Sequence, residues 1–415
     1  MTELGEIPSE WEVKKLKELL DVLKDGTHNP PKRTEEGIPL LSAENIFNGK
    51  INYGINEKCI SEEDYELMHK NYNIEKDDIL MTIVGTIGRV AVVKDNKKFT
   101  VQRSVAILRS NKKVNNLFLT QFLSSTICKK ELDRKSNSTA QAGLYLGELG
   151  KINIIVPSIK EQEKIASILL TVDEQIDNVD ALIEKNKELK KGLMQTLLTK
   201  GIGHTKFKKT EIGEIPSEWD IKSIDEITKE VYRYPTYYGI EYVEEGIAEI
   251  RGELLNDDAS IKKESFRYIS EKTAKKFPRT KLEVGDIVIS VRGTIGKVGY
   301  ITEELAGSNI TANLLRVSMN RNIMNEHFIK QLFLSDIMKR KFDEITTATT
   351  IKTFKVPEFK QIILAIPTKD EQDKIASILL EVDKKIEEHE NKKQKLENLK
   401  KGLMQQLLTG KIRTI

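Results

Sequence analysis

The chain has 415 residues, of which 39% are hydrophobic, and this length is enough for two domains with separate cores. Its mean hydropathy of −0.41 and the absence of a long apolar stretch exclude a membrane-spanning protein. The net charge of +3 balances 67 basic against 64 acidic residues, so charge alone does not indicate a nucleic-acid partner.

The first 156 residues predict a β-rich domain. The N-terminal residues have neither the basic nor the apolar segment of a signal peptide, so we expect a cytoplasmic protein. Hydrophobic runs at 79–84, 90–93, 105–108 and 152–156 predict strands. Between the first two runs, the Gly-Thr-Ile-Gly segment at 85–88 favours a structural turn over a direct DNA contact, because glycine permits positive φ. It is not a phosphate-binding loop, because the GxxxxGK[ST] pattern is absent. The two cysteines, Cys59 and Cys128, lack the spacing of a zinc site and predict no disulfide framework.

Residues 157–203 predict a long helix. Ser158 and Glu161 have the spacing of a capping box, in which hydroxyl and carboxylate bind free N–H groups at a helix start, and Thr368 and Glu371 repeat this spacing in the second half. Apolar residues then recur every three or four positions, as in a coiled-coil seam, and Gly201 is placed to cap the end. A helix of about 40 residues is about 60 Å long at about 1.5 Å per residue. That length exceeds one small domain and predicts a rigid spacer.

The second half repeats the first, with a domain at 204–366 and a long helix at 367–415. TELGEIPSEWEVKKLKEL at 2–19 returns as TEIGEIPSEWDIKSIDEI at 210–227, and EQEKIASILLTVD from Glu161 returns as EQDKIASILLEVD from Glu371. The predicted strands return at 287–291, 297–301, 314–317 and 362–366. Residues 20–75 and 228–283 are hardly alike, as are 110–150 and 318–358. One scaffold therefore carries two different surfaces.

This repeat predicts the fold class: two α/β (α+β) domains separated by two long antiparallel coiled-coil helices, with an internal pseudo-two-fold. The second helix can pack along the first only by running back, which makes the pair antiparallel. The residues predicted to form the helix-pair or partner interface are Ile165, Leu169, Val172, Ile176, Val179, Ile183, Ile375, Leu379, Val382 and Ile386.

Enzyme motifs are scarce. No HExxH, GxSxG or Walker pattern occurs, and no metal site is predicted. Asn29-Pro30-Pro31 resembles the start of the NPP[YF] motif of amino-methyltransferases, in which the aromatic residue stacks on a flipped base. Lys32 stands in the aromatic position here, so we interpret the segment as a turn. A non-DNA scaffold that binds partner proteins at both ends is the alternative to a DNA-binding protein.

The paired EQ-x-KIASILL-x-VD and KKGLMQ-x-LLT motifs, the GEIPSEW opening and the GTIG segment resemble the specificity subunit of type I restriction-modification systems. The resemblance covers essentially the whole chain. It implies two target recognition domains, each reading half of a bipartite DNA site, and helices that set the spacing and dock two methyltransferase subunits. It also implies that nuclease-translocase subunits join the complex. Catalysis would lie on the partners, which would bind S-adenosylmethionine, ATP and magnesium, and this chain would need no cofactor.

Given this resemblance, polar and basic loop residues are the candidates for DNA binding, because such side chains contact base edges and phosphates. The candidates in the first half are His28, Asn29, Lys32, Arg33, Ser42, Asn45, Arg103, Ser104, Ser138 and Gln141. Those in the second half are Arg233, Tyr234, Tyr237, Arg251, Arg292, Asn309, Asn313, Thr349 and Lys352. The tyrosines either stack on DNA or brace their loop. The two sets differ, as expected if each half reads a different sequence.

Overall fold

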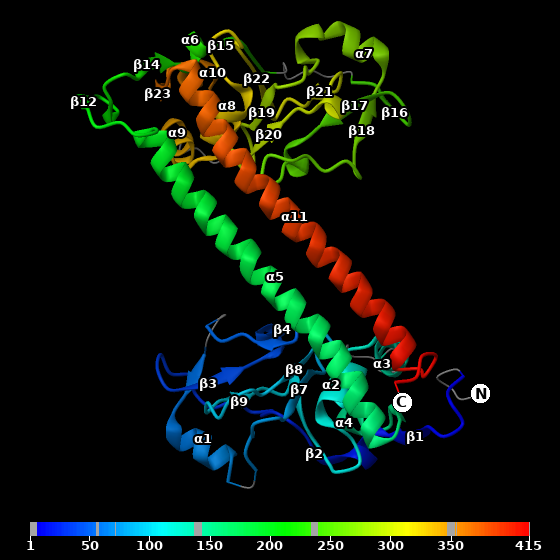
Figure 1. Cartoon of the computed structure of the whole chain (residues 1–415). Helices are drawn as coiled ribbons and strands as arrows, with labels where there is room; N and C mark the ends of the chain where they lie inside the picture. Colours follow the sequence, from blue (N-terminus) through cyan, green and yellow to red (C-terminus); the bar gives the residue numbers. More distant parts are fainter. Residues whose placement is uncertain are drawn as a thin grey trace. The chain divides into compact units, whose positions relative to one another are not determined.

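The computed structural model describes residues 6–54, 58–70, 72–136, 143–233, 240–346, 353 and 355–414. The chain forms two compact units (Figure 1). Unit 1 comprises Met1–Asp180 and Asn391–Ile415, and unit 2 comprises Ala181–Glu390. Each long helix thus contributes one half to each unit. No helix within the described ranges has an apolar stretch that could cross a membrane.

The main sheet of unit 1 has four antiparallel strands in the order β2 (Leu20–Asp25), β10 (Val105–Ser110), β7 (Ile79–Thr82) and β8 (Val90–Val92). Alternate side chains of β7 point to opposite faces. Ile79 and Met81 join the core beneath helices α2 (Asn116–Leu123) and α3 (Thr126–Ser136), whereas Leu80 joins a second core on the other face. Both faces are covered, which explains why the sequence shows an unbroken apolar run here.

A smaller sheet of unit 1 lies over that second core. Strand β3 (Ile38–Leu41) pairs antiparallel with β6 (Cys59–Ile60) and parallel with β9 (Thr100–Val101). Its parallel pairing brings Gln102 next to Leu41, through a Gln102 N–H bond to the Leu41 carbonyl at 2.8 Å. The remaining elements of this domain are β1 (Glu12–Lys15) paired with β11 (Asn153–Val156), the hairpin β4 (Ile46–Phe47) and β5 (Lys50–Ile51), η1 (Leu16–Leu19), η2 (Ala43–Asn45), α1 (Glu62–Met68) and α4 (Leu146–Leu149).

Unit 2 repeats the four-stranded main sheet of unit 1, and its second sheet has four strands where that of unit 1 has three. Its main sheet runs β15 (Thr228–Arg233), β22 (Leu314–Met319), β19 (Ile287–Ser290) and β20 (Val298–Tyr300). Its second sheet runs β16 (Tyr242–Val243), β18 (Arg267–Ile269), β17 (Ile247–Ile250) and β21 (Asn309–Ile310). The remaining elements are the hairpin β12 (Phe207–Thr210) and β13 (Gly213–Pro216), β14 (Asp220–Ser223) paired with β23 (Ile363–Ile366), α6 (Ile224–Ile227), α7 (Glu271–Lys276), α8 (Glu326–Leu334), α9 (Asp336–Ile345), α10 (Val356–Lys360), η3 (Gly252–Leu254), η4 (Pro278–Thr280) and η5 (Glu303–Leu305).

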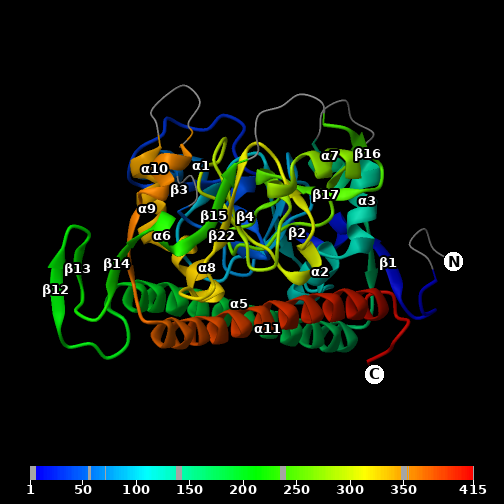
Figure 2. The same ribbon diagram turned by 90° about the horizontal axis from the view of Figure 1, so that it is seen from above.

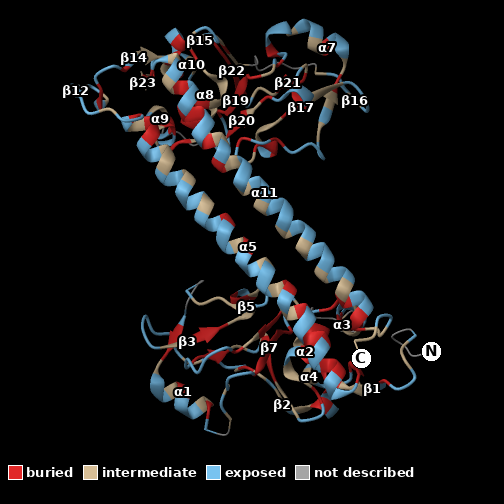
Figure 3. Cartoon of the chain, in the orientation of Figure 1, coloured by how far each residue is buried: buried red, intermediate tan, exposed pale blue. Residues whose placement is uncertain are grey.

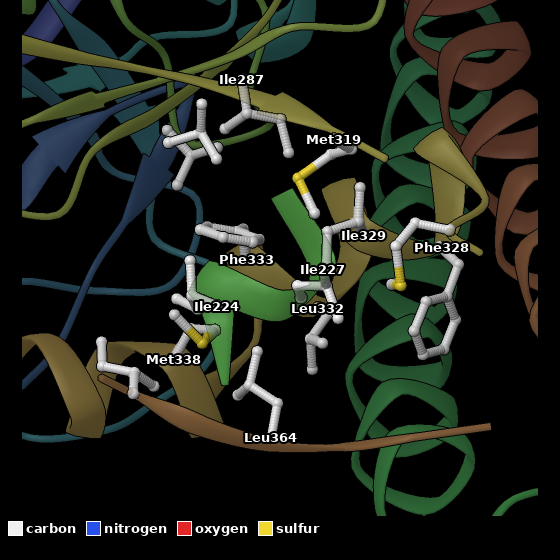
Figure 4. Packing of buried hydrophobic residues seen from close by; sticks show 14 of the residues in the cluster. Ile224, Ile227, Ile287, Met319, Phe328, Ile329, Leu332, Phe333, Met338 and Leu364 are labelled. Atoms are coloured by element: carbon white, nitrogen blue, oxygen red, sulfur yellow. The ribbon is translucent and has the colours of Figure 1, made fainter. Parts of the chain in front are cut away.

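The core of unit 2 lies between its main sheet and helices α8 and α9. Phe328, Ile329, Leu332 and Phe333 of α8 are at most 3% exposed, and Figure 4 shows them grouped with Met319 of β22. All the strands predicted from hydrophobic runs in the two halves form in the structure, which confirms the α/β class of both domains. Strands β2 and β15 were not predicted, because these edge strands are partly exposed and have fewer apolar residues.

The two long helices are α5 (Ile159–Lys200) and α11 (Lys369–Leu407). Gly201 and Gly410 have φ values of +65° and +70°, so both adopt the left-handed conformation expected of a glycine that follows a helix end. The middle of each helix is largely exposed (Figure 3).

The helices run antiparallel in both units (Figure 2). In unit 1, Asp173 pairs with Lys400 at 2.6 Å and Asp180 pairs with Lys393 at 2.7 Å. In unit 2, Lys190 pairs with Asp383 at 2.7 Å and Lys187 with Glu390 at 3.5 Å. The partner number falls as the residue number rises in each case. Of the predicted seam, Val172, Val179, Ile183 and Val382 are buried and Ile176 and Ile386 half-buried, while Ile165, Leu169, Ile375 and Leu379 are fully buried in the domain cores.

The predicted capping boxes form only in part. The N–H groups of Glu161 and Glu371 lie 3.4 Å from the hydroxyls of Ser158 and Thr368, as expected. Their carboxylates bind elsewhere, because each accepts a hydrogen bond of 2.9 Å from a tryptophan indole, Trp11 for Glu161 and Trp219 for Glu371. The repeated tryptophan and glutamate thus form a joint between each domain and the start of its long helix.

Each joint has a further partner of its own. In unit 1, Arg413 donates to both oxygens of Glu161, at 2.7 and 3.0 Å. In unit 2, the corresponding Glu371 accepts from the Ile202 N–H and contacts His204 Nε2, both at 2.9 Å. Burial of Glu161 raises its pKa, but hydrogen bonds from Arg413 and Trp11 outweigh burial and lower the pKa overall.

We therefore expect Glu161→Gln to destabilise the protein at neutral pH more than at acidic pH. A carboxylate whose pKa is lowered on folding contributes stability above its unfolded pKa, and this contribution is lost as pH falls through the folded value. The urea midpoints of the variant and the parent chain should differ most near pH 7 and converge below about pH 4. A constant difference across this range would contradict the role given to the charge.

The glutamine and final aspartate of the repeated helix motif also attach each helix to its domain. Gln162 Oε1 accepts from the Asn115 N–H at 2.7 Å, and Gln372 Oε1 accepts from the Asn325 N–H at 2.9 Å. Asp173 accepts from Gln121 Nε2 at 2.8 Å, and the corresponding bond in unit 2, from Gln331 to Asp383, measures 2.7 Å. These contacts give a structural reason for the near-identity of the two motifs.

Candidate nucleic-acid interface

A hollow of about 410 Å³ in unit 1 contains several of the predicted DNA-binding residues. It lies where the end of β3 and η2, the loop between β7 and β8, and the residues after β9 meet. Its lining residues are Arg33, Leu40, Ser42, Ala43, Glu44, Asn45, Lys58, Gly85, Thr86, Arg89, Gln102 and Ser104. Of the predicted residues, the hollow thus brings together Arg33, Ser42, Asn45 and Ser104.

The Gly-Thr-Ile-Gly loop shapes one wall of this hollow. Gly85 and Gly88 have φ values of +79° and +94°, and Gly293 and Gly296 in unit 2 have values of +80° and +79°. A Cβ on Gly88 would lie 3.1 Å from Leu132 of α3, so glycine also permits close packing there. The segment is a turn, as predicted. Gly85 and Thr86 nevertheless face the hollow as well.

Positive charge dominates the hollow. Arg33, Lys58 and Arg89 are exposed, and no carboxylate among the described residues lies within ion-pairing distance of any of them. Among the described residues that line it, Glu44 is the one acidic side chain. Three cations against one carboxylate attract an anion, and a phosphate group is the anion that DNA presents in a regular row.

Gln102 and Ser104 supply polar groups on a rigid backbone. The Gln102 carbonyl accepts from the Val105 N–H at 3.0 Å, in addition to the Gln102 N–H bond to Leu41. Ser104 Oγ accepts from the Ala43 N–H at 3.1 Å. The Gln102 side chain is half-buried and has no hydrogen bond to any described residue. Because the backbone of Gln102 is fixed and its side-chain amide has no partner among the described residues, the amide is available to pair with a base edge.

Ser42 and Asn45 have structural bonds of their own. They form a capping box around η2, in which Asn45 Oδ1 accepts from the Ser42 N–H at 2.9 Å. Asn45 is buried, and its amide nitrogen donates to the Asn52 carbonyl at 3.0 Å. These two residues therefore shape the floor of the hollow.

The other candidates of unit 1 lie outside the lining of the hollow. His28 Nε2 lies 2.7 Å from Asp25, while Asn29 and Lys32 are exposed. The exposed Arg103 follows Gln102, and its N–H binds the Thr27 carbonyl at 3.0 Å. Ser138 and Gln141 lie outside the described residues.

In unit 2, two arginines lie close together without a carboxylate partner among the described residues. Arg233, at the end of β15, donates through Nε to the Ala312 carbonyl at 3.2 Å, and Arg292 follows β19. Burial and the positive charge of Arg292 lower the pKa of Arg233. This pair is a second place where an anion would be stabilised.

Arg251 and Asn309 are less available. Arg251 is held by Glu253 at 2.5 Å and by the Ser265 carbonyl at 2.7 Å. Asn309 is 1% exposed and accepts from Thr280 at 3.0 Å, so its position in β21 does not support a base contact. Asn313 is exposed. Tyr234, Tyr237, Thr349 and Lys352 lie outside the part of the chain that the structure describes.

Sequence reasoning missed Lys58, Arg89 and, as a single residue, Gln102. Lys58 precedes a two-residue strand that showed no pattern. Arg89 directly follows the Gly-Thr-Ile-Gly turn, and a cation, Lys297, occupies the same place in the second half. This repeated cation was the signal available in the sequence. In the described ranges no three His, Cys, Asp or Glu side chains are grouped so as to hold a metal ion.

Comparison with known proteins agrees with this architecture. The chain is 29% identical, over 99% of its length and 96% of the relative's, to the putative type I restriction enzyme MjaX specificity subunit of Methanocaldococcus jannaschii. It is 26% identical, over 98% and 94%, to the MjaVIII specificity subunit of the same organism. The crystal structure of a type I restriction-modification S subunit from M. genitalium has the same fold, with a TM-score of 0.57 at 19% identity, covering 98% of this chain and 99% of that one.

A family profile matches the chain twice, once in each half. The profile is that of the type I restriction modification DNA specificity domain, and it matches residues 8–190 and 205–398. Each match contains one recognition domain together with most of the long helix that follows it. The chain therefore belongs to the family of type I restriction-modification specificity proteins, with two copies of the family's domain.

Proposed function

We propose that this chain is the sequence-specific DNA-binding specificity subunit of a type I restriction-modification complex. Each recognition domain reads one half of a bipartite site, and the long helices fix the spacing and dock two methyltransferase subunits. The observation that carries the proposal is the hollow of unit 1, which combines three cations that have no ion-pair partner among the described residues with the amide of Gln102 and the hydroxyl of Ser104. Phosphate contacts and base-edge contacts need those two kinds of group.

The duplication supports a divided site. Both halves have the same main sheet, the same glycine turn and the same joint to a long helix, while their loop residues differ. A repeated scaffold with two different surfaces fits a protein that reads two different half-sites. A single continuous site would need no such repetition.

Catalysis is assigned to partner subunits in this proposal. The relatives reported above are named specificity subunits, and that role needs no reacting group. Methylation would use S-adenosylmethionine on the methyltransferase subunits, and cleavage would use ATP and magnesium on nuclease-translocase subunits. The chain itself would need only DNA and these proteins, and the cytoplasm would be its place of action.

We expect cells that express this chain with its methyltransferase partner to carry a bipartite methylation motif with a fixed gap. Sequencing of methylated bases across the genome, compared with cells that express the partner alone, provides the measurement. A continuous motif would contradict the division between two domains. Failure of the purified chain, with or without its partner, to bind any duplex would instead favour a protein-binding scaffold.

A further inference from the structure

The duplication places equivalent residues of the two recognition surfaces in matching backbone positions. Ser104 and Asn313 correspond, since their carbonyls accept from the Ile83 and Val291 N–H groups at 2.9 Å. Gln102 and Thr311 correspond as well, since each carbonyl accepts from the residue three positions on, at 3.0 Å. The side chains at equivalent positions of the two recognition surfaces can therefore be compared directly within this chain.

Two positions keep their positive charge in both units. Arg89 and Lys297 follow the glycine turn, and their N–H groups bind the hydroxyls of Thr82 and Ser290 at 2.9 Å. Lys58 lies just before β6, and its carbonyl accepts a hydrogen bond from the N–H of Leu40 in the neighbouring strand β3. Arg267, in β18, has the corresponding backbone position, because it lies opposite Glu249 in the neighbouring strand β17.

Two other positions change their side chain. Gln102 becomes Thr311, and Ser104 becomes Asn313. Gln102 and Thr311 are half-exposed and Asn313 is exposed. Neither the Gln102 amide nor the Asn313 amide has a hydrogen bond to another described residue. The backbone at these positions is the same in both units, so the difference lies in the chemical groups presented.

This division matches the two kinds of DNA contact. Phosphates are the same at every base pair, so a group that binds them can be retained when the sequence read by a domain changes. Base edges differ, so the groups that select them must change. Glutamine and asparagine amides pair best with adenine, through its N6 and N7 atoms.

We infer that the exchanged positions, Gln102 with Thr311 and Ser104 with Asn313, select bases, whereas the retained cations at 58 and 267 and at 89 and 297 bind phosphate. This inference rests on the proposed function and adds to it which residues carry sequence information. Gln102 selects an adenine in the half-site of unit 1, and Asn313 selects an adenine in the half-site of unit 2.

The test selects binding sites for the purified full-length chain from a library of random DNA duplexes. The exchange variant Gln102→Thr with Ser104→Asn gives unit 1 the residues of unit 2 on its own scaffold. It should change the preferred base at one or two positions of one half-site, leave the other half-site unchanged, and bind the parent site about 5- to 150-fold more weakly. Gln102→Ala alone should relax the preference for adenine.

Lys58→Gln is the matched test of a phosphate contact. It should keep the selected motif, weaken binding to all sequences alike, and reduce the salt slope of binding by about one. Lys112→Gln, an exposed lysine beyond the far end of β10 from Ser104, is the control and should change neither motif nor affinity. Urea midpoints show which variants are folded.

Each outcome decides the inference. An unchanged motif for folded exchange and Gln102→Ala variants overturns the inference while the proposed function stands, provided the parent chain selects a motif. A motif altered by Lys58→Gln also overturns it. A parent chain that selects no motif overturns the proposed function together with the inference. A change confined to one half-site supports both.

Discussion

Replacing Arg33, Lys58 and Arg89 together by glutamine is expected to weaken duplex binding about 100-fold at physiological salt. Each phosphate contact releases a counterion and contributes about 0.9 to the slope of log affinity against log salt. Three lost contacts should therefore lower that slope by about 2.7 and the affinity near 0.15 M salt by about two orders of magnitude. Fluorescence anisotropy titrations with a labelled duplex across a salt series measure both quantities.

A control with the same change of net charge separates location from charge. Lys17, Lys112 and Lys113 are exposed residues near the end of the main sheet of unit 1 where β2 begins and β10 ends. Replacing all three by glutamine should leave affinity and salt slope nearly unchanged. Equal losses for the two triple variants would show that overall charge, and not the hollow, attracts the DNA.

Asp286→Ala should destabilise unit 2 by about 3 kcal/mol, because it removes the closest carboxylate from a buried guanidinium and leaves only Glu230 and Glu283, at 3.6 and 3.9 Å. Asp286 and Arg316 are 3% and 5% exposed, and their side chains meet at 2.7 Å. Asp286 also accepts from Ser318 at 2.5 Å and from the Glu283 N–H at 2.8 Å. Urea unfolding followed by circular dichroism should show a markedly lower midpoint.

The matched control removes both charges. Adding Arg316→Met to Asp286→Ala replaces the buried pair by apolar groups, which is often close to neutral, so most of the lost stability should return. The equivalent change in unit 1, Asp78→Ala, should cost less, because Arg109 is more exposed than Arg316 and its second carboxylate, Glu75, is closer, at 2.9 Å against 3.6 Å from Arg316 to Glu230. A single Asp286 variant as stable as the parent chain would contradict the buried ion pair.

Much of the fold was predictable because its signals are local or repeated. The three- and four-residue spacing after Ser158 predicted α5, and the apolar runs predicted the central strands β7 and β19. The hydrogen-bond partner of the Glu161 carboxylate was not predictable. Its spacing to Ser158 indicates a capping box, but the indole of Trp11 lies 150 positions away in the sequence and takes the carboxylate instead.

The candidate site was predictable only in part, because it is assembled by strand pairing. The parallel pairing of β3 with β9 places Gln102 beside Leu41, and no spacing in the sequence shows this. Asn309 and Asn313 are four residues apart in one polar segment, yet the first lies inside β21 and is buried while the second is exposed. The polar composition indicated the segment as a candidate, but only the strand register shows which of its side chains are buried.

The division of the long helices between the units has a consequence for biosynthesis. Unit 2 is one continuous stretch, whereas unit 1 needs Met404, Leu407 and Leu408 in its core and Arg413 at Glu161. Domains generally fold as they leave the ribosome, in order of synthesis. Here unit 1, which is translated first, cannot be completed until residue 413 has been made. Until then the apolar surface of unit 1 that contacts Met404, Leu407 and Leu408 stays exposed to solvent, although every residue of unit 2 has already been synthesised.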